Sequence, residues 1–277
     1  MKKFNIVSAS LVSATLLFAA CTKLDRLPET QLSDDVFWNT ETDLINATNR
    51  LYQQLDAFWI DNRADDVTNT AVDQVSSGNR VIPNTSGDWN DRYDEIFTAN
   101  NILEKADRAV NVPAAIRNRY KGEARFFRAL ANTNLVMKYG DVALVMKTLT
   151  VNSPELLMGR TPRQQVIATI YDDLDSAAAY LPRRANLIAT QYGRVTRSTA
   201  LALKARLGLY EGTRGKFHAD AASNWQSHLN VAITAATAVM GEGHTLYASY
   251  PNLFTITGEG IANTENIFVK TGKVFSI

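Results

Sequence analysis

The sequence predicts a mainly α fold: a tetratricopeptide-like array of helical hairpins with long loops and a few short strands near the C-terminus. Three observations predict it. Apolar residues recur at steps of three and four along most of the chain after residue 40, which is the spacing of one helix face. Capping residues and prolines mark where these segments begin and end. Two Ala/Leu/Arg-rich segments, closing at Gly140 and Gly212, lie about two tetratricopeptide periods of roughly 34 residues apart.

The first expected helix begins near Thr40, where Thr40 and Asp43 form a weak capping box, and it ends before Asp61. Residues 61–88 have no apolar period, so we expect a long loop there. A loop of that length inside a compact domain is often functional. A second helix is expected over 89–110, with Phe97 among its inward-facing apolar residues.

The remaining helices follow from similar signals. Pro113 suits the first turn of a helix that runs to Gly140, and Thr161-Pro162 opens a helix that stops at Pro182. A further helix is expected from Thr196 to just before Gly212, and another over roughly 219–240. After residue 241 the pattern breaks into short segments, and 267–270 is expected to be a strand.

Composition excludes several classes of protein. The chain has 277 residues, of which 45% are hydrophobic and 21% are charged, as in a folded globular protein. The 29 basic and 28 acidic residues nearly balance and form no basic run, which argues against a nucleic-acid partner. One cysteine and three histidines leave little material for a disulfide or a metal centre, so no cofactor is expected.

The first residues indicate a targeting segment. Residues 1–20 have a short basic head and an apolar run too short to span a bilayer comfortably, which is typical of a secretory signal peptide. The run ends in small residues before Cys21 and so resembles a bacterial lipobox, whose cysteine is diacylated. A plain signal peptide with a chance cysteine is the alternative. Two or three acyl chains, palmitate among them, would anchor the chain firmly, and 21–36 would be a polar tether. By resemblance to lipoprotein sorting, Thr22 favours the outer membrane.

No catalytic motif is present. The sequence contains no nucleophile elbow, no zincin motif and no phosphate-binding loop, so we expect the protein not to be an enzyme. Asp172, Asp173 and Asp175 are interpreted as a solvated helix face. His218 and His228 do not share a helix face, and both are interpreted as surface or interhelix hydrogen-bonding residues.

Several segments, in order along the chain, match those of a known family. They are Cys21 with its tether, Phe37-Trp38 leading to Tyr52, Trp89-x-x-x-Tyr93-x-x-Ile96 with Asn100, Glu123-Ala124-Arg125-Phe126-Phe127-Arg128-Ala129 continuing to Tyr139-Gly140-Asp141-Val142, Arg160-Thr161-Pro162, Arg194-Val195-Thr196, and Glu265-Asn266-Ile267-Phe268. In these segments the chain resembles the SusD/RagB nutrient-binding lipoproteins. Relatives continue past the position of Phe268 with a second half, so the helical domain, 37–277, is expected to be incomplete at its C-terminus.

The resemblance implies a surface-exposed lipoprotein of the outer membrane. Such a protein captures an oligosaccharide or another nutrient and passes it to a SusC-like TonB-dependent transporter. The alternatives are a non-binding tetratricopeptide-like interaction protein, or a truncated remnant, on the same membrane. A glycoside hydrolase is a third reading, but one sequence cannot show the paired carboxylates that it needs.

Candidate ligand-binding residues lie in and beside the long loop. Sugar rings have an apolar face and many hydroxyls, so their capture needs aromatic faces beside polar side chains. The candidates are Trp59, Asp65, Asp66, Asn69, Asp73, Arg80 and Trp89. Core packing is the competing interpretation for the two tryptophans, and loop capping is the competing one for Asp65 and Asp66.

Overall fold

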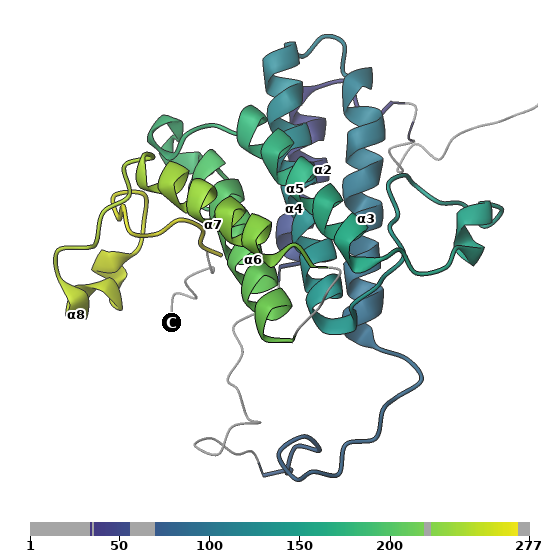
Figure 1. Cartoon of the computed structure of the whole chain (residues 1–277). Helices are drawn as coiled ribbons and strands as arrows, with labels where there is room; N and C mark the ends of the chain where they lie inside the picture. The colour runs from purple at the N-terminus through teal and green to yellow at the C-terminus, as the bar shows by residue number, and fades with distance from the viewer. Residues whose placement is uncertain (1–33, 35, 56–69, 219–222, 271–277) are drawn as a thin grey trace, which may run out of the picture. The chain divides into compact units, whose positions relative to one another are not determined.

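The computed structural model describes residues 34, 36–55, 70–218 and 223–270 (Figure 1). The chain divides into two units, residues 1–37 and 38–277. In the first unit, the predicted signal peptide, Cys21 and nearly all of the 21–36 tether lie outside the described residues. The second unit is mainly helical, as predicted.

The helices are arranged as packed pairs, in agreement with the predicted hairpin array. They are α2 (Glu41–Gln53), α3 (Gly87–Lys105), α4 (Ala114–Tyr139), α5 (Arg163–Tyr180), α6 (Arg197–Phe217), α7 (Trp225–Met240) and the short α8 (Tyr250–Leu253). Single 3₁₀ turns add η1 (Ala106–Arg108), η2 (Pro154–Leu157), η3 (Arg184–Asn186), η4 (Ala189–Gln191) and η5 (Ile256–Gly258). Successive helices pack on each other from α3 through α7, and α2 lies against both α3 and α4 (Figure 1).

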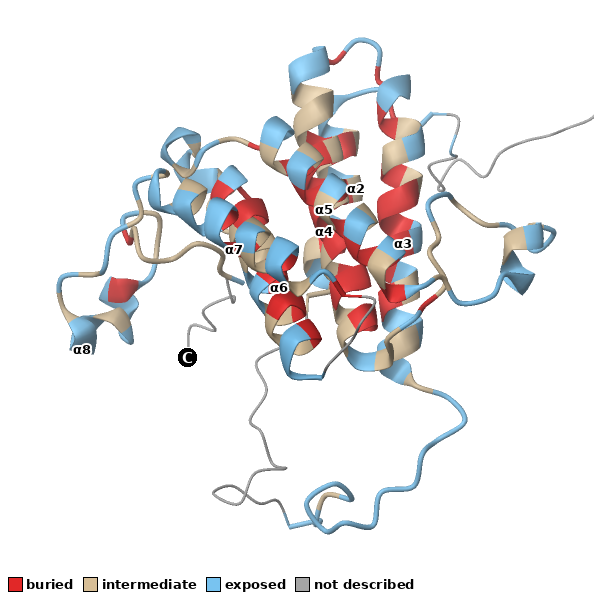
Figure 2. Cartoon of the chain, viewed as in Figure 1, coloured by how far each residue is buried: buried red, intermediate tan, exposed pale blue. Residues whose placement is uncertain are grey.

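Helix α4 is at the centre of the core. It packs on α2, α3 and α5, and buried residues concentrate where these helices face one another (Figure 2). Ala124, Ala129 and Ala131 are fully buried on α4 and let neighbouring helices approach closely. Phe126 and Phe127 are also buried, and their rings pack edge-on against Phe268 and against Tyr52 of α2, respectively. A buried side chain of that size contributes roughly 1.5–3 kcal/mol to folding.

Capping residues mark the starts of α2 and α6 as predicted. The Thr40 side chain accepts a hydrogen bond from the Asp43 backbone N–H at 3.3 Å, and the Asp43 carboxylate accepts one from the Thr40 N–H at 2.8 Å. This is the predicted capping box, and it satisfies donors that the first turn leaves unpaired. Thr196 forms a second capping box, with Thr199, at the start of α6.

The predicted end of α6 is wrong. The helix continues past Gly212 to Phe217, because Gly208, Gly212 and Gly215 form a stripe that faces α7. A Cβ at Gly208 would lie 2.8 Å from the His228 carbonyl oxygen, so only glycine allows this close approach. Here glycine marks a helix contact rather than a helix stop.

The predicted strands near the C-terminus are also wrong within the described residues. Residues 245–270 consist of turns and irregular backbone with α8 and η5, and 267–270 is not a strand. A strand needs a neighbouring strand for its backbone groups, and 267–270 pairs with no strand in the described chain; the Ile267 carbonyl oxygen accepts a hydrogen bond from the Thr199 hydroxyl at 3.2 Å instead. The β-bridge that the structure does contain joins Val142 to Thr161.

Two features are absent from the described residues. None of the helices among them combines the length and the apolar composition that a transmembrane segment requires. Those residues also contain no group of three or more His, Cys, Asp or Glu side chains placed to hold a metal ion.

Candidate functional site

The predicted site residues lie in different parts of the structure, and some of them lie outside its described residues. Trp59, Asp65, Asp66 and Asn69 lie outside the described residues. Asp73 is partly exposed and accepts a hydrogen bond from the Val75 N–H at 2.7 Å, which is a turn-capping role, and Arg80 is exposed. Trp89 lies in the first turn of α3 and lines a groove, whereas Asp73 and Arg80 are not among its lining residues.

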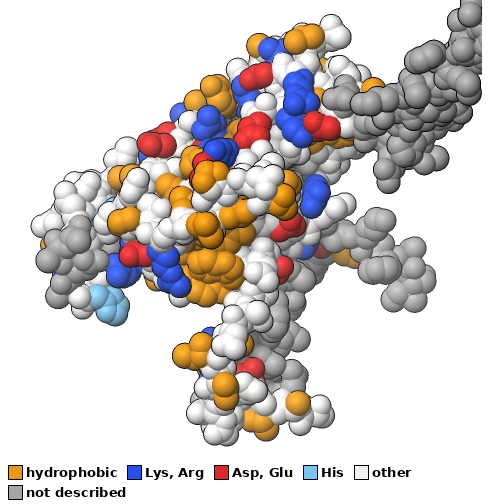
Figure 3. Space-filling view, turned by 90° about the vertical axis from the view of Figure 1, so that its right-hand side faces the viewer, with side chains coloured by type: hydrophobic (Ala, Val, Ile, Leu, Met, Phe, Trp, Pro, Cys, Tyr) orange, Lys and Arg blue, Asp and Glu red, His pale blue; other side chains and the backbone are white. Residues whose placement is uncertain are grey.

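This groove lies between α3 and the segment that joins α4 to α5, and it is called the α3 groove. Its volume is about 430 Å³, within the range of small-molecule sites. The lining residues are Trp89, Tyr93, Phe97, Ala143, Val145, Lys147, Leu149, Glu155, Leu156 and Met158. Figure 3 views the side of the molecule on which α3 and this segment lie, and it shows hydrophobic side chains gathered there.

Aromatic side chains of α3 form one wall of the groove. Trp89, Tyr93 and Phe97 are spaced four residues apart and therefore share a helix face. The Trp89 ring centroid lies 5.0 Å from that of Tyr93, and the Arg160 guanidinium lies 5.7 Å from it. Phe97 is 44% exposed, which corrects the prediction that it faces the core. Ile96 and Ala99 face the core instead.

The other wall begins with a segment that is attached to the start of α3. The Tyr93 hydroxyl donates to the Ala143 carbonyl oxygen at 2.9 Å, and burial raises the pKa of Tyr93 to about 12, so it stays a donor at neutral pH. The bridge between Val142 and Thr161 closes the base of the segment. Gly140 precedes it with a φ of 75°, a left-handed conformation that suits glycine where a helix ends and the chain turns.

Further along α3, two polar side chains hold the same segment. The Asn100 side-chain amide donates to the carbonyl oxygens of Val145 at 3.1 Å and Lys147 at 3.0 Å. The Glu104 carboxylate accepts a hydrogen bond from the Thr148 N–H at 2.7 Å. Because these contacts follow one face of α3, the segment runs along the helix and the groove lies between the two.

Asn100 is itself positioned by a buried ion pair. The Arg128 guanidinium donates to the Asn100 side-chain oxygen at 2.8 Å and makes two hydrogen bonds of 2.7 Å to the carboxylate of Asp173. Asp173 is 2% exposed and also binds Arg125, so its interpretation as part of a solvated face is wrong. A bidentate arginine–carboxylate pair fixes orientation as well as charge. The pair thus links α5, α4 and α3 to the groove wall.

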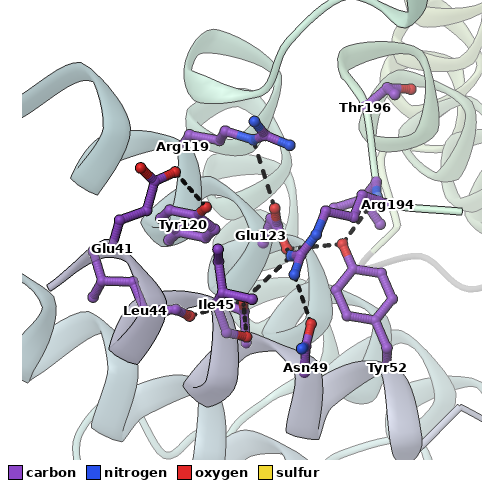
Figure 4. Close-up of polar contacts among 12 residues, drawn as sticks. Glu41, Leu44, Ile45, Asn49, Tyr52, Arg119, Tyr120, Glu123, Arg194 and Thr196 are labelled. Carbon is purple, nitrogen blue, oxygen red and sulfur yellow. Dashed lines mark hydrogen bonds and ion pairs between the residues drawn. The ribbon is translucent and has the colours of Figure 1, made fainter. Parts of the chain in front are cut away.

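A second buried network holds α2 against α4 (Figure 4). The carboxylate of Glu123 accepts hydrogen bonds from the Tyr52 hydroxyl at 2.8 Å and from Arg194 at 2.6 Å, and Arg194 also donates to Asn49 at 2.6 Å. Burial raises the pKa of Glu123, although the Arg194 charge opposes that shift. Helix α2 precedes the long loop and α3 follows it, so this network fixes the helix from which the loop departs.

One predicted site residue lines the α3 groove, and the other lining residues were not among the candidates. Trp89 was a candidate, but Tyr93, Phe97, Lys147 and Glu155 were not. The spacing of the three aromatic residues on α3 was a usable signal. No sequence signal pointed to Lys147 or Glu155. Contacts between residues far apart in the sequence bring their segment to α3.

The fold and the groove define a class: a helical-hairpin scaffold with an aromatic surface groove. A protein family described as starch-binding and associating with the outer membrane matches residues 23–209. The chain belongs to this SusD-like family, as its sequence motifs predicted.

Individual relatives agree with that assignment. SusD-like protein P38 of Formosa agariphila is 27% identical over 227 residues, covering 76% of this chain and 43% of the relative. A SusD-like protein of Bacteroides ovatus is 28% identical over 223 residues, covering 73% and 39%. The chain therefore spans less than half the length of these relatives.

Solved structures show the same fold. A SusD-like protein from Bacteroides fragilis superposes with a TM-score of 0.69 at 23% identity, covering 88% of this chain and 47% of that one. A SusD-like carbohydrate-binding protein from the same species gives 0.68 at 24% identity, covering 84% and 46%. A laminarin-binding SusD-like protein gives 0.64 at 20% identity, covering 83% and 51%.

Proposed function

We propose that this chain is a lipid-anchored, surface-exposed lipoprotein that captures oligosaccharide and delivers it to a SusC-like TonB-dependent transporter. The observation that carries the proposal is membership of a family described as starch-binding and associating with the outer membrane. The names of two solved relatives, one carbohydrate-binding and one laminarin-binding, support a glycan as the ligand.

The ligand surface in this proposal is the region from Trp59 to Trp89. Aromatic faces bind the apolar side of a sugar ring, and carboxylates and amides hydrogen-bond its hydroxyls. Trp89, in the first turn of α3, is only partly buried, and its ring lines a surface groove, which supports a binding role over simple core packing. Binding without turnover fits a family whose description names binding and no reaction.

Isothermal titration calorimetry of the purified chain with maltoheptaose, laminarihexaose and xylohexaose tests glycan capture. Trp59→Ala should weaken binding about tenfold, and Asp66→Ala roughly three- to tenfold. Phe217→Ala and Asp175→Ala are matched controls, since both side chains are exposed on other helices. Wild-type affinity in both loop variants would remove the loop residues from the site. Absence of binding to every glycan would favour the non-binding interaction protein instead.

The anchor has its own test. Wild-type chain expressed in a Gram-negative host should be recovered in the outer-membrane fraction, and Cys21→Ala should leave it soluble, because the acyl chains attach through that thiol. Equal recovery of both proteins in the soluble fraction would contradict the lipobox.

A further inference from the structure

Helices α6 and α7 form the pair at one end of the row of helices (Figure 1). Each helix from α3 to α6 packs extensively on a helix before it and on a helix after it. Helix α7 packs on α6, and no later helix of the described chain covers it to a similar extent. In a repeat array the terminal pair needs either a polar outer face or a partner that covers it. The side chains on the outside of this pair therefore decide between the two.

One side of the α6–α7 pair is already covered by α5. Glu211 of α6 accepts a hydrogen bond from Arg163 at 2.9 Å, and His228 of α7 bonds to Gln164 at 3.1 Å; Arg163 and Gln164 both belong to α5. The glycine stripe of α6 faces α7. Because a helix turns about 100° per residue, the positions that follow these glycines point to the side opposite α5.

That opposite side is called the outer face, and it carries one stripe of residues from each helix. Gly208 lies against Ala232, and Leu209 and Ile233 are the next residues of two antiparallel helices, so both turn to the same side. Leu209 is 55% exposed, Ile233 is 65% exposed and Met240 is 71% exposed. The outer face consists of Arg206, Leu209, Thr213 and Lys216 of α6 and Gln226, Leu229, Ile233, Ala236 and Met240 of α7. Both stripes step by three and four, which is the spacing of a ridge that packs on another helix.

The charge on the outer face has one sign. Arg206 and Lys216 are exposed, and neither forms an ion pair with a described residue; the Lys216 ammonium lies over the Phe217 ring, 5.5 Å from its centroid. The acidic side chain of these two helices is Glu211, which is buried on the α5 side. A partner that covers the apolar residues can therefore gain two further contacts if it carries carboxylates beside its own apolar stripe.

We propose that the outer face docks an amphipathic α-helix of a partner protein, with an apolar stripe flanked by acidic residues. The apolar stripe packs against Leu209, Ile233 and Met240. The carboxylates pair with Arg206 and Lys216. The contact repeats, with a separate chain, the helix-on-helix packing by which the array itself is built. It uses neither the α3 groove nor the long loop, so it is independent of glycan capture.

Two other occupants fit this surface less well. A second copy of the chain would add the same two cations and no exposed acidic residue from α6 or α7, so charge would oppose the contact. An anionic bilayer would attract Arg206 and Lys216, but a helix that lies in a membrane surface needs a wide apolar face. Here Thr213 and Gln226 interrupt the apolar residues.

The probe for the test is a fluorescein-labelled peptide of about 20 residues, with leucines at steps of three and four and glutamates beside them. Its counterpart has lysines in place of the glutamates. In fluorescence anisotropy titrations, the wild-type chain should bind the glutamate peptide at least about tenfold more tightly than the lysine peptide, because only the first complements the two cations.

Two variants of the outer face and two matched controls locate the binding. Ile233→Asp should weaken binding of the glutamate peptide more than about tenfold. Arg206→Glu should weaken it roughly three- to tenfold and strengthen binding of the lysine peptide. Ile256→Asp and Lys138→Glu change an exposed isoleucine and an exposed lysine elsewhere, and both should bind like wild type. Unchanged thermal unfolding verifies that each variant is folded.

The remaining outcomes would overturn the proposal. They are a wild-type chain that binds neither peptide, one that binds both equally, and binding that survives both Ile233→Asp and Arg206→Glu. A dimer in sedimentation analysis that Ile233→Asp converts to a monomer would assign the face to a second copy. Vesicles of phosphatidylethanolamine and phosphatidylglycerol that retain the Cys21→Ala chain, but release it when Ile233→Asp is added, would assign the face to a lipid surface.

Discussion

The α4–α5 and α6–α7 pairs are joined by different chemistry. Between α4 and α5 the contact contains the buried ion pair of Arg128 and Asp173, and Arg163 of α5 donates to the Val136 carbonyl oxygen of α4 at 2.7 Å. Helix α7 has no Asp, Glu, Lys or Arg, and it meets α6 at glycines. The first pair is positioned by directional hydrogen bonds and the second by the close fit of two backbones.

Because of this difference, the two contacts tolerate different kinds of substitution. A buried ion pair contributes little net stability when intact, but removal of one partner leaves an uncompensated charge in the core. A glycine contact contains no charge to expose, but any added side chain forces the helices apart. The α4–α5 contact is therefore sensitive to substitutions that remove a charged side chain, and the α6–α7 contact is sensitive to substitutions that add side-chain atoms at a glycine.

The largest expected effect is at the charged contact. Asp173→Ala should lower the free energy of unfolding by about 3–5 kcal/mol, because Arg128 and Arg125 lose their buried carboxylate. Urea denaturation followed by circular dichroism measures it. Asp175→Ala is the control, since its exposed pair with Lys204 should contribute at most about 1 kcal/mol. Equal losses in the two variants would contradict the role given to burial.

A smaller effect is expected at the glycine contact. Gly208→Ala should cost about 1–3 kcal/mol, because its Cβ would lie 2.8 Å from the His228 carbonyl oxygen and 2.9 Å from the Ala232 nitrogen, both of which are backbone atoms. Gly87→Ala, where a Cβ meets nothing within 4 Å, is the matched control and should be neutral or stabilising. A Gly208→Ala protein as stable as wild type would show that α7 can move freely on α6.

The smallest effect is a pH dependence at the one titratable side chain of α7. His228 bonds to Tyr171 at 2.9 Å and to Gln164 at 3.1 Å, and burial lowers its pKa below the usual 6.5, with Arg163 acting in the same direction and Glu211 in the opposite one. The unfolded chain therefore binds the proton more readily. Stability should fall as pH decreases from 6.5 through the lowered pKa.

Denaturation midpoints measured between roughly pH 5 and pH 8 check this dependence. His228→Gln should reduce the slope, because the substitution removes the titrating group and keeps side-chain hydrogen bonding. A slope that is the same in the variant and in wild type would assign the pH dependence to other groups.

The sequence predicts those parts of the fold that depend on residues close together along the chain. The capping box at Thr40 and the apolar stripes of the helices are set within a few residues. Asp173 looked solvated because its partner Arg128 is 45 residues away, and Gly212 looked like a stop because its contact lies on α7. Glu155 lines the groove because it lies on a segment that Tyr93, Asn100 and Glu104 hold against α3, and no local pattern encodes those contacts.

The way in which the segment between α4 and α5 is attached to α3 affects which of its side chains can be changed. Tyr93, Asn100 and Glu104 bind its backbone carbonyls and a backbone N–H, and the Thr148 hydroxyl also donates to Glu104, so the attachment at Ala143, Val145 and Lys147 does not depend on the side chains at those positions. Val145 and Lys147 can therefore be exchanged by point substitution while their main chain stays in place. The side chains that line the groove and the main chain that shapes it are therefore separately adjustable, which makes the groove lining a place where design can change the surface without changing the scaffold.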